Sequence, residues 1–152
     1  MKVQLCIPQA DETDTWIMEI GQIKFGPAPQ SGWHIQLRGN MRAIENPNDM
    51  IPLLPILEMD RDLIYSHLES VSKNSPKISS RVMEFPETLL LQCAFETSVS
   101  DYWPLKGLKW LKSAPNLSRH FEEILSALQK RSWATQALKQ EIKSIQKSIR
   151  QQ

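Results

Sequence analysis

The chain has 152 residues, of which 41% are apolar and 23% are charged, and its formal net charge is +1. This length and composition are typical of one globular domain, here spanning residues 1–152, and they argue against disorder. The N-terminal residues lack the continuous apolar stretch of a signal peptide or a membrane span. We therefore expect a cytoplasmic protein that has no membrane partner.

The pattern of residues 1–45 predicts an antiparallel meander with one buried face and one solvent-exposed face. Apolar and polar residues alternate in three segments, as in half-buried strands. These segments are 2–7, 16–25 and 33–37. The alternation changes phase at Gly21-Gln22, which indicates a β-bulge within the second strand. A polar turn is expected at 11–14 and a hairpin loop at 26–32, where Gly and Pro gather.

Residues 46–58 are predicted to form an extended apolar connector, because neither a helix nor a central strand tolerates three closely spaced prolines. These prolines are Pro47, Pro52 and Pro55. After the connector, Asp60 is expected to cap a helix over 60–73, where apolar residues recur at helical spacing.

Residues 81–97 are predicted to add two strands to the sheet. The expected strands are Val82 to Phe85 and Leu89 to Phe95, with Pro86 between them. The second run is apolar on both faces, which suits a central strand, and a buried helix is the alternative.

Residues 100–150 predict two or three helices. Pro104 fits the first turn of a helix, and Ser132 is expected to cap the last one. The apolar stripe of that last helix comprises Leu138, Ile142, Ile145 and Ile149. Strands first and helices last favour the α+β class. The predicted fold is an antiparallel sheet of about five strands with one inserted helix and two or three C-terminal helices packed on one face.

Charge is distributed unevenly along the chain. Residues 130–152 contain six Lys or Arg and one acid, whereas the remainder contains 12 basic and 16 acidic residues. Four of the cations recur at spacings of 4, 4 and 3, namely Lys139, Lys143, Lys147 and Arg150. Such a basic stripe suits nucleic acid phosphates, an acidic protein or anionic lipid, and the alternative is a solvated face without a partner. A pI of 7.8 and the lack of a known nucleic-acid-binding motif argue against nucleic acid.

A second candidate partner-binding group comprises Trp103, Lys106 and Trp110. The two Trp residues are seven positions apart, about two helical turns, so they lie on one side of a helix. Trp beside Lys is typical of a protein interface. Alternatively, both rings cover the sheet while the Lys side chains reach water. The proline-rich connector is another candidate contact surface, or else a strap that closes the core. The segment from Tyr102 to Leu111, Tyr-Trp-x-x-x-x-Leu-x-Trp-Leu, resembles stretches in small bacterial accessory proteins, some of them immunity-like.

Catalytic and metal-binding motifs are absent from the sequence. The histidines His34, His67 and His120 are scattered, without the spacing of a zinc site, and no glycine-rich phosphate loop or nucleophile elbow is present. Cys6 and Cys93 also lack metal or redox spacing and are expected to be buried thiols.

These observations favour a small cytosolic non-enzymatic protein-binding domain, immunity-like or homo-oligomeric, that needs no cofactor and no metal. The partner would be another protein or a second copy of the chain. One alternative is nucleic-acid binding through the basic C-terminal helix. The other is an enzyme with a site near His34, Arg38 and Arg42.

Overall fold

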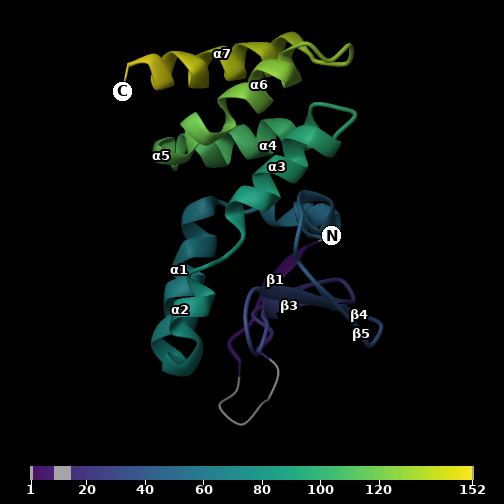
Figure 1. The fold of residues 1–152 in the computed structure, drawn as a ribbon, viewed down its shortest axis with the longest axis vertical. Helices are drawn as coiled ribbons and strands as arrows, with labels where there is room; N and C mark the ends of the chain where they lie inside the picture. The colour runs from purple at the N-terminus through teal and green to yellow at the C-terminus, as the bar shows by residue number, and fades with distance from the viewer. Residues whose placement is uncertain (1, 9–14, 152) are drawn as a thin grey trace.

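In the computed structural model, which describes residues 2–8 and 15–151, a small sheet lies at one end of the molecule and a group of helices forms the other end (Figure 1). The sheet contains β1 (Val3–Leu5), β2 (Met18–Ile20), β3 (Ile23–Pro27), β4 (Trp33–Leu37) and β5 (Asn40–Ala43). The expected α+β class and five-stranded antiparallel sheet are confirmed. The polar turn expected at 11–14 lies outside the described residues.

The five strands follow one another in chain order as an antiparallel meander. Ile20 pairs with Ile23, so Gly21-Gln22 is the turn of a tight hairpin, and the expected β-bulge was wrong. Gly21 has a φ of 60°, which a type II′ hairpin requires at its first central residue.

Strand β5 was not predicted from the sequence. It follows a second tight turn, in which Arg38 and Gly39 have φ values of 52° and 84°. Positive φ at both central residues is the geometry of a type I′ hairpin. β5 is only four residues long and all of them are exposed, so its brief alternation of polar and apolar residues does not mark a buried face.

The buried face of the sheet packs against the helices α1 (Arg61–Asn74) and α2 (Ser79–Val82), which lie beside it in Figure 1. The rings of Trp33 and Phe85 meet edge to face, with centroids 5.5 Å apart. The indole Nε1 of Trp33 donates to the carbonyl of Arg81 at 3.0 Å. On α1, buried His67 lies 2.8 Å from the carbonyl oxygen of Ile17. Aromatic packing and backbone-directed hydrogen bonds thus join the sheet to these two helices.

The proline-rich connector is a 3₁₀ helix, η1 (Pro47–Glu58), and the expected extended conformation was wrong. A 3₁₀ helix repeats every three residues, so Pro52 and Pro55 fall on one side of it. The next row of the helix consists of fully buried apolar residues, namely Met50, Leu53 and Ile56. The φ that proline imposes is compatible with 3₁₀ geometry, which explains why the three prolines are tolerated here.

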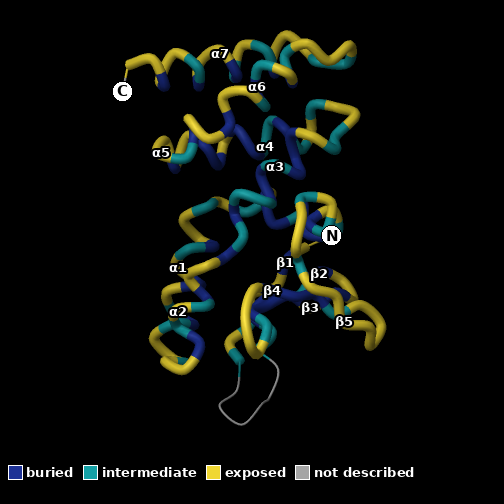
Figure 2. The backbone as a smooth tube through the Cα atoms, in the orientation of Figure 1, coloured by how far each residue is buried: buried dark blue, intermediate teal, exposed yellow. Residues whose placement is uncertain are grey.

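The two strands predicted within 81–97 were wrong, because this region contains α2 and the helix α3 (Glu87–Thr97). The buried helix considered as the alternative is what the structure contains. Most of α3 is buried, as Figure 2 shows for the middle of the molecule. A helix that is apolar on most sides lacks the amphipathic period by which helices are recognised.

The short helix η2 (Pro76–Ile78) lies beside α2. The helices after α3 form the end of the molecule away from the sheet, namely α4 (Tyr102–Lys112), α5 (Pro115–Ser118), η3 (Arg119–Phe121), α6 (Glu122–Gln129) and α7 (Gln136–Arg150). Figure 1 shows α6 and α7 above α3 and α4, so these helices cover the helical layer rather than the sheet itself. The cap of α7 is Thr135, whose hydroxyl accepts from the amide of Leu138 at 3.2 Å, and the expected cap Ser132 was wrong. No helix in the described part of the chain combines the length and apolar content that crossing a bilayer requires.

Candidate functional site

Helix α7 presents four cations along one side. We call Lys139, Lys143, Lys147 and Arg150 the basic face of α7. Lys139 is half-buried and the other three are exposed. At 100° and 1.5 Å per residue, the four positions fall within about 80° of arc and extend over about 17 Å of the helix axis. The structure therefore brings together all the residues that the sequence singled out on this helix.

The cations of the basic face make no ion pair with any residue that the structure describes. The one acid of α7, Glu141, lies on the opposite flank of the helix and pairs with Lys112 of α4. The charge of the basic face is therefore uncompensated within the described part of the chain. Figure 2 shows that the outward side of α7 is exposed.

The basic face is held on a fixed support. The apolar stripe of α7 is buried as predicted, with Leu138 and Ile142 fully so. Beside the basic face, the side-chain amide of Gln146 lies 3.4 Å from that of Gln129 and 3.3 Å from the hydroxyl of Ser126, both on α6. We call these three residues the polar seam. Because the backbone of α7 is fixed on both flanks, the Cα positions of its four cations form a fixed row, from which the side chains extend.

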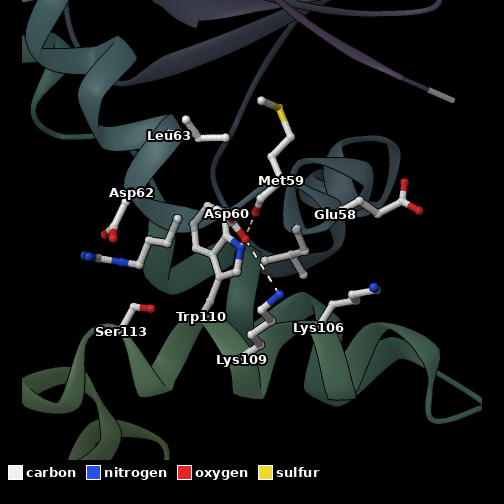
Figure 3. Close-up of a pocket in the computed structure, with 11 residues that line it drawn as sticks. Glu58, Met59, Asp60, Asp62, Leu63, Lys106, Lys109, Trp110 and Ser113 are labelled. Atoms are coloured by element: carbon white, nitrogen blue, oxygen red, sulfur yellow. Dashed lines mark hydrogen bonds and ion pairs between the residues drawn. The ribbon is translucent and has the colours of Figure 1, made fainter.

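A pocket of about 260 Å³ lies elsewhere, where the junction of η1 and α1 meets α4. Figure 3 shows Trp110 at its base, with the indole pointing toward the η1–α1 junction. Trp110 is 2% exposed, and its Nε1 donates to the carbonyl of Met59 at 3.0 Å. The volume is below the range of about 300–1,000 Å³ that is typical of ligand pockets.

One ion pair and one hydrogen bond to a carboxylate connect the elements around this pocket. The ammonium of Lys109 lies 3.6 Å from the carboxylate of Asp60, as the dashed line in Figure 3 marks. The hydroxyl of Tyr102 donates to Glu58 at 2.5 Å, and this hydrogen bond raises the pKa of Tyr102. These pairs attach α4 to η1 and α1. The pocket is therefore better explained as a packing junction than as a binding site.

A buried charge cluster joins the start of α1 to the start of α3. The guanidinium of Arg61 donates to both carboxylate oxygens of Glu87, at 2.5 and 2.9 Å, and the Tyr65 hydroxyl donates to the same carboxylate at 2.8 Å. Glu87 is only 6% exposed. Burial and the nearby carboxylate raise the pKa of Tyr65. The cluster was missed because residues 89–95 were assigned to a strand, so Glu87 was not recognised as the first residue of a helix.

The predicted group of Trp103, Lys106 and Trp110 is partly used inside the molecule. Trp110 is buried, whereas Trp103 and Lys106 are half-buried. The ring of Trp103 meets that of Tyr102 edge to face at 4.8 Å, and the Lys106 ammonium lies 5.6 Å from the Tyr102 ring centre. Most apolar residues of η1 are buried as well, although Ile51 is 50% exposed. These two candidate surfaces therefore offer less accessible apolar area than the sequence suggested.

The three residues of the alternative enzyme site do not converge. His34 pairs with Ala43 in the register of β4 and β5, while Arg42 pairs with Ile35, so His34 and Arg42 lie on opposite faces of the sheet. Arg38 lies in the turn at the far end of β4.

His34 is buried beneath Trp16, whose ring stacks on the imidazole at a centroid distance of 4.5 Å. Within residues 2–8 and 15–151, no three His, Cys, Asp or Glu side chains are grouped so that they could hold a metal ion. Cys93 is buried and Cys6 is half-buried, both thiols are free, and burial raises the pKa of each.

Comparisons with protein-family models, with curated proteins and with solved structures found no match to this chain.

Proposed function

We propose that this protein is a non-enzymatic binding module that recognises an acidic partner protein through the basic face of α7. The observation that carries this proposal is the row of four cations, which is fixed on a packed helix and has no counter-charge among the described residues. An uncompensated row of this kind steers an oppositely charged partner and fixes how it docks.

The charge distribution of the whole chain supports a compact acidic partner over a long polyanion. Residues 1–129 contain 16 acidic and 12 basic residues and would repel nucleic acid that extends beyond α7. None of the residues between these four cations in the sequence is aromatic, so the row offers no ring on which nucleic acid bases could stack. Nucleic acid remains the second candidate, because cations within about 17 Å could also neutralise successive phosphates.

The test uses two charge-reversal variants of equal net charge. The first replaces Lys139, Lys143 and Lys147 with Glu, and the control replaces three exposed cations elsewhere, namely Lys2, Lys73 and Lys77. The wild-type protein and both variants are immobilised and exposed to a lysate of the source cell, once untreated and once treated with nuclease. Captured proteins are crosslinked and then quantified by mass spectrometry.

We expect acidic proteins that are captured by the wild type and the control but lost with the α7 variant. Identical capture by all three proteins would refute the role of the basic face. Loss of all capture after nuclease treatment would favour the nucleic-acid alternative instead.

A further inference from the structure

We propose, building on the proposed function above, that the partner element recognised by the basic face of α7 is an acidic α-helix whose carboxylates recur at three- and four-residue spacing. The argument rests on the spacing of the cations, on the surface beside them and on the acidic remainder of the chain.

The spacing of the cations matches that of another helix. Consecutive positions of the basic face lie 4, 4 and 3 residues apart, or about 6, 6 and 4.5 Å along the axis. A partner helix with Glu or Asp at the same intervals repeats these distances on one side of its own surface. An extended chain places alternate side chains about 6.6–6.8 Å apart, so its register with the cations drifts over successive contacts.

The surface beside the cations is polar. The polar seam adjoins the basic face on the α6 side, and the exposed neighbours on α7 are Gln140, Ser144 and Ser148. This surface offers no apolar anchor of the kind that dominates tight interfaces. The partner helix is therefore recognised by its charges, and the complex is expected to form fast and to weaken as salt is added.

Three of the four cations are lysines. The ammonium of Lys is a compact charge on a flexible stem, whereas Arg presents a rigid fork that binds carboxylate or phosphate bidentately. A row made mostly of Lys can adjust to carboxylates on a neighbouring helix, because an ammonium group does not require the planar bidentate geometry of a guanidinium contact. Because ammonium groups bind carboxylate and phosphate alike, the choice of an acidic helix rests on the spacing of the cations and on the acidic remainder of the chain, which repels a long polyanion.

The test measures the binding of two labelled peptides by fluorescence anisotropy at 50 and 200 mM NaCl. Both are 21-residue peptides, stapled so that each is helical by circular dichroism, and both contain four Glu. In the matched peptide the Glu residues follow 4, 4 and 3 spacing on one side, and in the control peptide they are spread evenly around the helix. Disordered poly-glutamate and a 20-base-pair DNA duplex serve as further probes.

We expect the matched peptide to bind about tenfold more tightly than the control peptide at 50 mM NaCl, which corresponds to a difference of about 1.4 kcal/mol. This preference should be lost when Lys139, Lys143 and Lys147 are replaced with Glu, and retained in the variant of Lys2, Lys73 and Lys77.

Equal affinity for the two peptides would overturn the helix proposal. The proposed function would still stand in that case, provided that both affinities depend on the three lysines of α7. Tighter binding of poly-glutamate or of the duplex than of the matched peptide would also overturn the helix proposal. Failure of the proposed function is recognised separately, by lysate capture that the α7 variant leaves unchanged.

Discussion

Replacing Gly107 with alanine is expected to destabilise the protein, although the same change inside a helix usually does the opposite. Gly107 is buried in the middle of α4, at the point where this helix crosses α3. A Cβ atom there would lie 2.9 Å from Cε1 of Phe95 and 3.5 Å from a methyl group of Leu91. The Phe95 ring is itself fixed, since it packs edge to face on Phe121 at 5.5 Å.

Two opposing effects decide the result. Alanine is favoured over glycine in a helix by about 1 kcal/mol, whereas overpacking a closely packed core costs about 1–3 kcal/mol. Because Phe95 is only 2% exposed, its ring has little room to move away. We therefore expect a net loss of about 1 kcal/mol, which for a domain of this size lowers the melting temperature by about 2–4 °C.

The assay is urea unfolding followed by circular dichroism, on Gly107→Ala, on Phe95→Leu and on the double variant. Leucine at position 95 removes the ring that the new methyl group meets. Alanine at position 107 should therefore be neutral or stabilising in that background, with a coupling energy of about 1–2 kcal/mol. A gain of about 1 kcal/mol from Gly107→Ala alone would refute the close approach of α3 and α4.

Four further outcomes follow from the structure. Glu87→Gln should lower the free energy of unfolding by about 3 kcal/mol in urea titrations, because it leaves the Arg61 charge without its buried partner; an effect below about 1 kcal/mol would contradict this. The raised pKa of Tyr65 means that the folded state retains a proton that the unfolded state loses above about pH 10, so stability should fall as the pH rises beyond that value, and Tyr65→Phe should reduce this slope. Gly26→Ala would place a Cβ 1.9 Å from the carbonyl oxygen of Thr15, so we expect a loss of at least about 3 kcal/mol, and unchanged unfolding would contradict the strand placement. The triple lysine variant of α7 should unfold within about 1 kcal/mol of the wild type, because its three side chains make no ion pair among the described residues.

Most of the sheet could be predicted because its pattern is local. Alternation over 2–7, 16–25 and 33–37 reflects a sheet with one buried face; β1, β2 and β4 lie within these segments, and β3 begins in the second of them. β5 was missed because it is only four residues long and entirely exposed, so its apolar residues mark no buried face. The hairpin that leads into β5 contains Arg38 at positive φ, a conformation that a non-glycine residue in the sequence does not predict.

The central helices were harder to predict for the opposite reason. α3 is surrounded by η1, α4 and α6, so apolar residues occur on most of its sides and the helical period disappears. A short apolar run of this kind fits a central strand equally well. The Arg61–Glu87 pair depends on the same assignment, because the two residues are 26 positions apart and meet only once α3 is placed.

The candidate surfaces illustrate which sequence patterns identify a surface and which do not. Trp103 and Trp110 lie on one side of α4, a pattern that suits a buried core as well as an interface. The hydrogen bond from Trp110 to Met59 shows that Trp110 belongs to the interior, but the two residues are 51 positions apart, so the sequence pattern could not reveal this contact. A row of four cations is different, because burying each charge without a partner would cost several kcal/mol. Such a row must face water or an oppositely charged molecule wherever its helix packs. The exposure of the basic face of α7 was therefore predictable from spacing alone, which is why this face carries the proposed function.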